Sequence, residues 1–448
     1  MTDNITHGNA PVNGSSNGSA NVTAPGSIDE NAFDVEKIAV SPNAPQQVSA
    51  LLEQLHADGK EYLGVAPKPG FSCLKRLDRW FMPWRHPVKQ LSGTVGRSNE
   101  KPMLIAFDQS TSYAALEIGV DVGLFNALGT DDKPKSVAGL AVKTGVEPVL
   151  LGRIMKHLAA MGAILETGPD EYSPSGFSKT LTVEKYSDAF PLMTSRFTQG
   201  ILALPAFLKK NGYRNPTSPT NTAFHMGHNT DMGFFEHVQQ EPTTAKQFNN
   251  HMGVYAQGRP RWMDPGFYPV QERLIDGAEI GDEDTLLVDV GGSFGHDLID
   301  FHRKWPHAPG RLVLQDLPEV VGSVKEVPSS IHVTAHDFFT EQPVKGARAY
   351  YLHSVLHDWP DHICHKILLN LVDAMKPGYS RLLINENLIP DRGAYWETTS
   401  LDLIMMEIGS GERTERQWRT LLGNVGLRIV KIWGVQRGVE SLIECELA

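Results

Sequence analysis

Three successive apolar segments of the sequence end in residues suited to holding a nucleoside. The first runs into Gly291 and Gly292, where the lack of side chains lets a backbone approach a ligand closely before a helix begins. The second ends at Asp316, about twenty residues on, where a carboxylate can accept hydrogen bonds from ribose hydroxyls. The third ends at Asp337 and Phe338, an acid for an adenine amino group and a ring for its face. This succession predicts a site for an adenosyl ligand.

Each of these features has a second interpretation when it is taken alone. Glycine-rich turns also occur in dinucleotide binders, but the spacing here is not Gly-x-Gly-x-x-Gly, which disfavours a nicotinamide cofactor. Asp316 is equally placed to cap a helix beginning near Pro318, and both roles can hold together. The prediction of an adenosyl site therefore depends on the three segment ends occurring in order.

The segments that must position these residues alternate between strand-length apolar runs and longer stretches. The predicted strands are Leu286–Val290, Arg311–Gln315, Ile331–Ala335, Ala347–Leu352 and Arg381–Asn385. The predicted helices are Asp297–Trp305, Pro318–Lys325, His362–Met375 and Asp402–Met406. Such alternation predicts an α/β fold, a mostly parallel sheet with helices on both faces. Arg428–Trp433 and Ser441–Glu446 predict a closing hairpin at its edge.

A different pattern, helices followed by a hairpin, covers Ala106 to Leu181. The predicted helices are Ala114–Leu128, Ser136–Gly145 and Pro148–Gly162, and the hairpin strands are Ala163–Leu165 and Tyr172–Pro174. This order is typical of a winged-helix domain, whose best-known use is DNA binding. The third helix carries only Arg153, Lys156 and His157 as basic residues. Packing or dimerisation is therefore the favoured role.

The beginning of the chain is low in complexity. Residues 1–45 are predicted to be a disordered tail, and residues 46–105 to form an N-terminal arm. Within the arm, the stretch 71–87 mixes aromatic with basic side chains. It suits either a membrane surface or partner, or an arm packing on its own domain or on a second subunit. We favour the packing arm.

The bulk properties of the chain exclude several classes of protein. Its 448 residues suffice for two or three domains, and no run of 18 apolar residues suggests a membrane span. The first residues lack a signal-peptide pattern. Three scattered cysteines, Cys73, Cys364 and Cys445, predict neither a disulfide framework nor a metal cluster, so we expect a cytoplasmic protein. A formal net charge of −11 disfavours nucleic acid as a partner.

Five segments together resemble the motif series of plant and fungal small-molecule O-methyltransferases, the cation-independent class similar to caffeate O-methyltransferase. They are Val288–His296, Leu314–Pro318, His357–Pro360, Leu383–Glu386 and Gly411–Trp418. The match runs from roughly Ala114 to the C-terminus, and His-Asp-Trp after the fourth strand is its most specific part. The fungal branch, which acts on aromatic polyketides and related metabolites, fits best.

The resemblance implies a cofactor, an architecture and a reaction. The cofactor is S-adenosyl-L-methionine, bound by a Rossmann-like class I methyltransferase domain over residues 271–448. Residues 106–270 would form a mainly helical winged-helix domain that mediates a homodimer and covers the substrate. The reaction is methylation of a small-molecule hydroxyl, which we expect to be phenolic. The matching cofactor-binding positions are Gly291, Gly292, Asp316, Asp337, Phe338 and His353.

The resemblance also implies a general base. His357 matches that base, and Glu386 and Glu412 match two acids that flank it. A carboxylate that accepts from one ring nitrogen fixes the tautomer and leaves the other nitrogen free to take a proton. Taken singly, His357 could cap a helix, Glu386 could be a solvent-facing acid at a strand end, and Glu412 could pair with Arg413.

The chain departs from the family pattern at two neighbouring positions. Plant members have Lys and many fungal members Arg where this chain has His353, so we expect an altered cofactor contact. Ser354 replaces an aromatic pocket residue, which suggests room for a bulkier or fused-ring acceptor. Candidate acceptor-binding residues, each with a helix-core role as the alternative, are Phe224, His225, Phe234, Met252, Tyr255 and Met405.

Two other functions remain open at this point. Some fungal relatives bind S-adenosylmethionine yet catalyse pericyclic or dehydration reactions without methyl transfer. Such proteins would be expected to lose the base or its acids, and here His357, Glu386 and Glu412 are all present. A binding-only or transcriptional role would rest on the winged-helix region alone. Methyl transfer is the favoured prediction.

Overall fold

The computed structural model describes residues 109–448, apart from short gaps at 256–258, 280, 282–283, 325–326 and 436–437. The tail 1–45 and the whole predicted arm 46–105, with its aromatic and basic stretch 71–87, lie outside the described residues, as does the side chain of Tyr255. None of the described helices is both long enough and apolar enough to cross a membrane.

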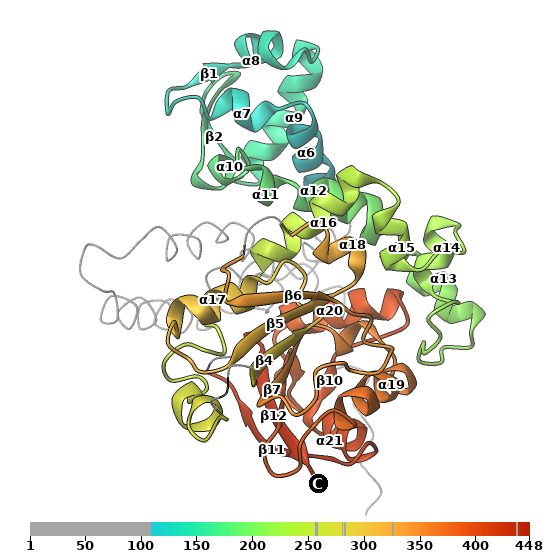
Figure 1. Cartoon of the computed structure of the whole chain (residues 1–448). Helices are drawn as coiled ribbons and strands as arrows, with labels where there is room; N and C mark the ends of the chain where they lie inside the picture. The colour runs from blue at the N-terminus through green and yellow to red at the C-terminus, as the bar shows by residue number, and fades with distance from the viewer. Residues whose placement is uncertain (1–108, 256–258, 280, 282–283, 325–326, 436–437) are drawn as a thin grey trace, which may run out of the picture. The chain divides into compact units, whose positions relative to one another are not determined.

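A seven-stranded sheet organises the C-terminal half in the order β11-β12-β8-β7-β4-β5-β6 (Figure 1). Its strands are β4 (Thr285–Val290), β5 (Arg311–Asp316), β6 (Ile331–Ala335), β7 (Ala349–His353), β8 (Arg381–Glu386), β11 (Leu427–Trp433) and β12 (Ser441–Leu447). The first five are parallel, and β12 pairs antiparallel with both β8 and β11. The predicted α/β fold and closing hairpin are therefore confirmed, with β11 forming the edge.

The helices between the strands differ from prediction mainly in length. They are α17 (His296–Lys304), α18 (Pro318–Val321), α19 (Asp361–Val372), α20 (Trp396–Glu407) and α21 (Glu415–Gly423). The helix predicted over Pro318–Lys325 stops at Val321, because the chain turns at Gly322. The helix predicted over Asp402–Met406 begins earlier, at Trp396, in a stretch whose apolar residues show little helical periodicity.

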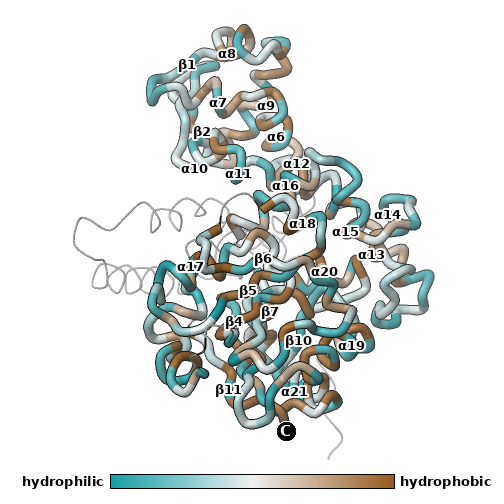
Figure 2. The backbone as a smooth tube through the Cα atoms, in the orientation of Figure 1, coloured by the Kyte–Doolittle hydropathy of each residue, from teal (hydrophilic) through white to brown (hydrophobic). Residues whose placement is uncertain are grey.

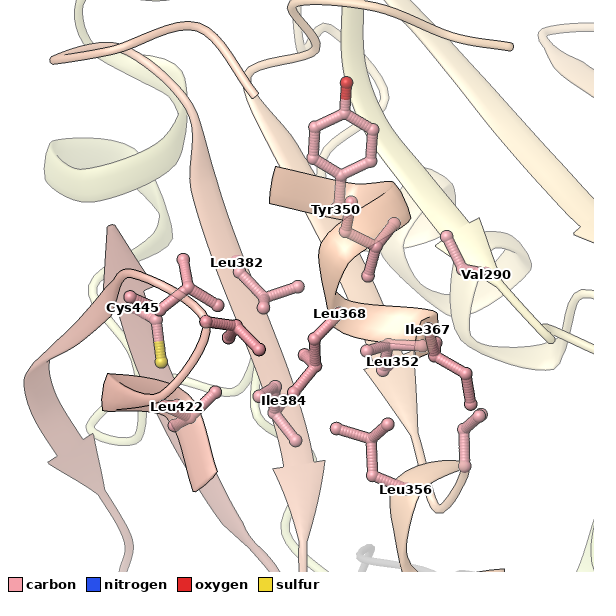
Figure 3. Close-up of a cluster of buried hydrophobic side chains, with 14 of the residues drawn as sticks. Val290, Tyr350, Leu352, Leu356, Ile367, Leu368, Leu382, Ile384, Leu422 and Cys445 are labelled. Carbon is pink, nitrogen blue, oxygen red and sulfur yellow. The ribbon is translucent and has the colours of Figure 1, made fainter. Parts of the chain in front are cut away.

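Alternation of side chains along the strands builds a hydrophobic core on each face of the sheet. On one face, Val288, Tyr350 and Leu352 pack with residues of α19 and α21, a cluster drawn in Figure 3. On the other, Leu287 and Tyr351 pack with residues of α17 and of the segment 262–274. Brown, hydrophobic stretches of the chain run through this sheet in Figure 2. Because the parallel strands share one direction, their carboxyl ends meet at one edge, where ligands bind in such folds.

The first described region contains helices and a small sheet. Its elements are α6 (Gln109–Asp121), α7 (Leu124–Leu128), β1 (Lys135–Ser136), α8 (Val137–Thr144), α9 (Pro148–Ala160), β2 (Ile164–Gly168) and β3 (Glu171–Pro174). The single helix predicted over Ala114–Leu128 is in fact two, because Gly123 adopts a left-handed conformation with φ of 65°. Ser136 caps α8, Pro148 begins α9, and β3 pairs with β2 as a hairpin.

Helices fill the segment between this region and the sheet. They are α10 (Gly176–Thr180), α11 (Glu184–Ser187), α12 (Ala189–Leu192), η4 (Met193–Phe197), α13 (Thr198–Lys210), α14 (Ala223–His228), α15 (Phe234–Gln239), α16 (Pro242–Tyr255) and η5 (Gln271–Ile275). The glycines of α13 and α14 allow close packing there, since a Cβ at Gly227 would lie 2.4 Å from the Gln199 carbonyl. Both helices also contact α20.

Candidate active site

His357 lies in a short 3₁₀ turn, η6 (Leu356–Asp358), directly after β7. The turn is held from one side by Glu386, the last residue of β8, which is fully buried. The Glu386 Oε1 atom accepts hydrogen bonds from the backbone N–H groups of Val355, Leu356 and His357, at 3.2, 2.9 and 3.3 Å. Glu386 therefore binds the backbone that carries the histidine.

The imidazole itself meets a second acid. Glu412 Oε1 lies 2.8 Å from His357 Nδ1, whereas Glu386 Oε2 lies 3.8 Å from the same atom. On the other side of the ring, Asp358 Oδ1 is 3.5 Å from Nε2, too far for a strong hydrogen bond. The three residues that the family resemblance implied are thus brought together, but the two glutamates do different things. Only Glu412 is placed to fix the tautomer.

Buried charges set the protonation of this cluster. Burial by itself would lower the pKa of His357, but the negative charges of Glu386, Asp358 and Glu412 outweigh it and raise that pKa to about 10. Burial raises the pKa of Glu386 to about 7 and that of Asp358 to about 6. The imidazole is therefore a much stronger proton acceptor than a histidine in water.

Three further residues hold Glu412 and the His357 turn, and none of them was predicted from the sequence. Asp402 Oδ1 of α20 accepts from the Glu412 backbone N–H at 2.9 Å, and the Ser410 hydroxyl donates to the His357 carbonyl at 2.5 Å. Asp358 was missed as a charge partner, although its place next to the histidine was a usable signal. Asp402 and Ser410 carry no such signal, because only folding of the 402–412 segment brings them to the turn.

The predicted glycine turn lies at the carboxyl ends of β4 and β5. Gly291 has φ of +75°, and a Cβ at Gly292 would lie 2.5 Å from the Asp289 carboxylate, so neither position tolerates a side chain. Asp316 accepts from the Ser293 N–H at 2.7 Å and from the Leu317 N–H at 2.8 Å. Asp316 does not cap α18, because Leu317 is the N-cap residue and no side chain caps that helix. Its carboxylate keeps further acceptor sites for ribose hydroxyls.

The remaining predicted adenosyl residues lie at the same edge. A Cβ on Gly291 would lie 3.7 Å from the Phe338 ring, so the glycine turn and this ring are neighbours. Asp337 is half-buried, and its Oδ1 accepts from the Phe339 N–H at 2.9 Å. A glycine turn without side chains, a carboxylate with free acceptor sites and a half-buried ring fit an adenosyl group. S-adenosyl-L-methionine is the cofactor that these residues would hold.

His353, at the end of β7, is bound by the protein on both ring nitrogens. Nδ1 lies 2.6 Å from Asp297 Oδ2 and Nε2 lies 3.0 Å from Glu440 Oε2. Asp297 also accepts from the Tyr351 hydroxyl at 2.8 Å and from Arg261 at 3.0 Å. Burial would lower the pKa of His353, but the two carboxylates raise it well above its ordinary value.

The proposed acceptor residues are only partly together. Phe234 is buried among the rings of Phe197 and Phe224, and Met405 of α20 is also buried, whereas 43% of Met252 is exposed. Phe224 is fully buried, and His225 Nδ1 is 2.7 Å from the Thr222 hydroxyl. These contacts favour core or capping roles for Phe234, Phe224 and His225.

A ring that the sequence analysis passed over reaches the cofactor edge. Phe235, the neighbour of Phe234 on α15, is 38% exposed, and its ring stacks on Trp359 with centroids 6.4 Å apart and planes 27° apart. Trp359 also meets Phe339 edge-on at 5.0 Å. Alternating exposure along a short helix, with Phe234 inside and Phe235 outside, is not visible in the sequence alone.

The charged cluster has a geometry that a cation could use. Ligand atoms of His357, Glu386 and Glu412 all lie within 4.8 Å of one another. Competing contacts occupy most of them, because Glu412 accepts from His357 and Glu386 Oε1 accepts from three backbone groups. Glu386 Oε2 and Glu412 Oε2 have no hydrogen-bond partner within the described part of the chain.

Comparison with known sequences gives a consistent result. The profile of the O-methyltransferase domain family matches residues 274–428. Methyltransferase cfoC of Aspergillus candidus is 40% identical over 331 residues, covering 73% of this chain and 82% of the relative. O-methyltransferase mpaG of Penicillium brevicompactum is 39% identical over 346 residues, or 76% and 87% of the two chains. Demethylsterigmatocystin 6-O-methyltransferase of Aspergillus parasiticus is 36% identical over 320 residues, or 71% and 81%.

Solved structures resemble the chain over most of its length. A structure described as a pericyclic reaction enzyme has a TM-score of 0.76 and 29% identity, covering 89% of this chain and all of the other. OxaC in complex with sinefungin and meleagrin has a TM-score of 0.75 and 27% identity, covering 90% of this chain and all of the other. The geometry at the strand edge and these similarities lead to one family.

Proposed function

The chain belongs to the O-methyltransferase family and is an S-adenosyl-L-methionine-dependent O-methyltransferase, and from this premise we propose the following reaction. A methyl group passes from the cofactor to a phenolic hydroxyl of a secondary metabolite, with His357 as general base. The observation that carries this proposal is the 2.8 Å contact between His357 Nδ1 and Glu412. It commits one ring nitrogen to the protein and leaves Nε2 to face an acceptor.

The bound cofactor supplies an activated methyl group on a sulfonium. The residues of the chain then have two tasks, alignment of the acceptor and removal of its proton. A phenol has a pKa of about 10, like tyrosine, and the pKa of His357 is also about 10. Matched values make the proton transfer from phenol to Nε2 nearly balanced, which is favourable for general base catalysis. Glu412 stabilises the imidazolium that results.

The same cluster implies that His357 holds a proton before ligands bind at neutral pH. His357 must lose that proton before it can act as a base. The positive sulfonium of a bound cofactor would favour this loss, because a second positive charge nearby is disfavoured. We therefore expect the rate of methylation to rise with pH on the acidic side of its profile.

The acceptor class is supported by the relatives and by the site. One relative is named as a 6-O-methyltransferase of demethylsterigmatocystin. Trp359 lies two residues after the base His357, and the ring of Phe235 stacks on it. Such a pair of rings suits a planar acceptor. Ser354, half-buried beside Glu440, leaves more room than an aromatic side chain would. We propose an aromatic polyketide or a similar fused-ring phenol.

A second candidate function is a pericyclic or dehydration reaction without methyl transfer. It is favoured by the structural similarity to a pericyclic reaction enzyme. It is disfavoured by the complete set of His357, Glu386 and Glu412, which such a reaction would not require. The experiment is to incubate the enzyme with cofactor and a panel of phenolic polyketides, then to quantify S-adenosylhomocysteine against product. A one-to-one ratio supports methyl transfer, and product without S-adenosylhomocysteine would defeat it.

We also propose that the protein acts as a cytoplasmic homodimer on a small-molecule acceptor, through a winged-helix domain within 106–270. Large apolar side chains exposed on its helices support an interface, among them Val142 at 87% and Val149 at 71% exposure. Light scattering at working concentrations tests this, and a monomer would contradict it. His353 as a cofactor contact is likewise a proposal, whose test is cofactor affinity in a His353 variant.

A further inference from the structure

The residue after Glu412 holds the other side of the histidine turn. Arg413, only 5% exposed, donates from Nη1 to the Leu356 carbonyl at 2.8 Å and from Nη2 to the Trp359 carbonyl at 2.7 Å. Its Nε donates to Asp361 Oδ1 at 2.9 Å. The two carbonyls stand on either side of His357, so one guanidinium spans the whole turn.

The N–H and carbonyl groups of the turn are thus held by two side chains of opposite charge. Glu386 accepts from its N–H groups, and Arg413 donates to its carbonyl groups. Because Glu412 and Arg413 are adjacent, the residue that contacts the imidazole and the residue that holds its backbone move together. A shift of Arg413 would therefore change the distance between Glu412 and Nδ1.

The guanidinium is itself fixed in plane and direction. It lies over the ring of Trp418, with its central carbon 5.2 Å from the ring centroid. Its backbone is fixed as well, because β10 (Arg413–Thr414) pairs in parallel with β9 (Leu388–Ile389). The strand β9 begins two residues after Glu386. A rigid planar fork can serve two carbonyls at once, whereas an ammonium group is a single point of charge. Lysine could keep the charge of Arg413 but not this geometry.

We propose that Arg413 is a positioning residue that sets the His357 turn against Glu412 for proton transfer. The role depends on the fork of the side chain more than on its charge. This inference rests on the proposed function, in which His357 is the base. Arg413 acts through His357 and contacts neither the glycine turn nor Asp316.

The decisive variant is Arg413→Lys, which keeps the charge and removes the fork. We expect kcat to fall about ten- to a hundredfold, as small misplacements of catalytic groups do. The Kd for S-adenosylmethionine, measured by calorimetry, should stay within about twofold because the cofactor edge is untouched. The matched control is Arg416→Lys, an arginine of the following helix whose side chain is 82% exposed, and it should leave both values unchanged.

A readout besides activity is the titration of His357, followed by NMR of labelled histidine. Loosening of the turn moves Glu412 from Nδ1, so the pKa of His357 should be lower in Arg413→Lys than in the wild type. A variant with unchanged kcat and unchanged titration overturns the proposal. A variant with equal losses in cofactor binding and kcat also overturns it, because Arg413 would then support the whole domain.

Asp361→Asn tests the inference should Arg413→Lys not fold. Asp361 is 63% exposed on its side chain and orients the guanidinium without touching the turn. We expect a reduction of kcat by about threefold with the His357 titration shifted in the same direction, and wild-type values for both would reject the proposal. His357→Ala run in parallel separates the two hypotheses. Full activity there defeats the proposed function, while its loss beside a normal Arg413→Lys defeats only the positioning role.

Discussion

Two histidines four residues apart, at and just after the end of β7, both lie among carboxylates but differ in how many of their ring nitrogens are bound. His353 lies between Asp297 and Glu440, and His357 lies among Glu412, Glu386 and Asp358. At His353 both ring nitrogens have close carboxylate partners, at 2.6 and 3.0 Å. At His357 only Nδ1 has one, at 2.8 Å, while the contact of Nε2 is 3.5 Å long.

The difference shows what makes a histidine a base in a buried acidic environment. Carboxylates raise the pKa of both imidazoles, so basicity does not separate them. The separating property is an uncommitted nitrogen, which His357 has and His353 lacks. His353 is therefore a fixed cation that joins β7 to the start of α17 and to Glu440, and His357 can exchange a proton with an acceptor.

The largest effect should come from removing the free nitrogen. His357→Ala is expected to lower the rate of methylation by roughly 10²–10⁴, the usual contribution of a positioned base. Cofactor affinity should stay nearly unchanged, because the glycine turn and Asp316 do not contact the imidazole. Single-turnover kinetics with labelled S-adenosylmethionine measures the first quantity and calorimetry the second. Activity retained in full would show that His357 is not the base.

The next effect should come from the acids. Glu412→Gln and Glu386→Gln should each slow methylation by less than His357→Ala does, about ten- to a hundredfold, since the base remains present. Each removes a negative charge that raises the pKa of His357, so the acidic limb of the pH–rate profile should move to lower pH. The shift should be the clearer sign for Glu412→Gln. An unmoved limb in both variants would show that these charges do not control the base.

Much of this site could be predicted from the sequence, because its residues follow strand ends. Gly291, Asp316 and His357 each come directly after an apolar run, and parallel strands bring such positions to one edge. The family resemblance then associated Glu386 and Glu412 with His357. The five parallel strands were predicted to within two residues because buried parallel strands are short continuous apolar runs.

The division of labour within the site could not be predicted, because it depends on side-chain direction. Nothing in the sequence says that Glu386 faces backbone N–H groups while Glu412 faces the ring. Likewise, the family resemblance implied a cofactor contact at His353, but its side chain meets Asp297 and Glu440 within the protein. Phe235 was passed over because its exposure depends on how α15 packs.

A smaller effect on catalysis should follow from His353→Gln, with a larger one on stability. The variant removes the cation that Asp297 and Glu440 share, although Asp297 keeps its ion pair with Arg261. Removing one partner of a buried pair costs about 3–5 kcal/mol. The pKa of His353 is raised on folding, so its stabilisation is full below its unfolded pKa of about 6.5 and is lost as pH rises through the folded value. Thermal unfolding should therefore show the largest difference from wild type near pH 6. Methylation by the folded variant should fall less than tenfold, and a fall as large as that of His357→Ala would erase the distinction between the two histidines.

The smallest effect should come from removal of divalent metal ions. His357, Glu386 and Glu412 have the side chains and spacing of a three-ligand site, in which His357 would serve a cation instead of an acceptor. Binding there would require the His357 proton to leave and Glu412 to give up its hydrogen bond, and Glu386 Oε1 already accepts from three backbone groups. We therefore expect dialysis against EDTA to leave kcat within about twofold, and added Zn²⁺ to inhibit by occupying the base. Mg²⁺ should have no effect, because it keeps its waters and prefers oxygen ligands. Loss of activity with EDTA and recovery with one metal would instead make this cluster a metal centre, and His357 would then be a ligand as fully committed as His353.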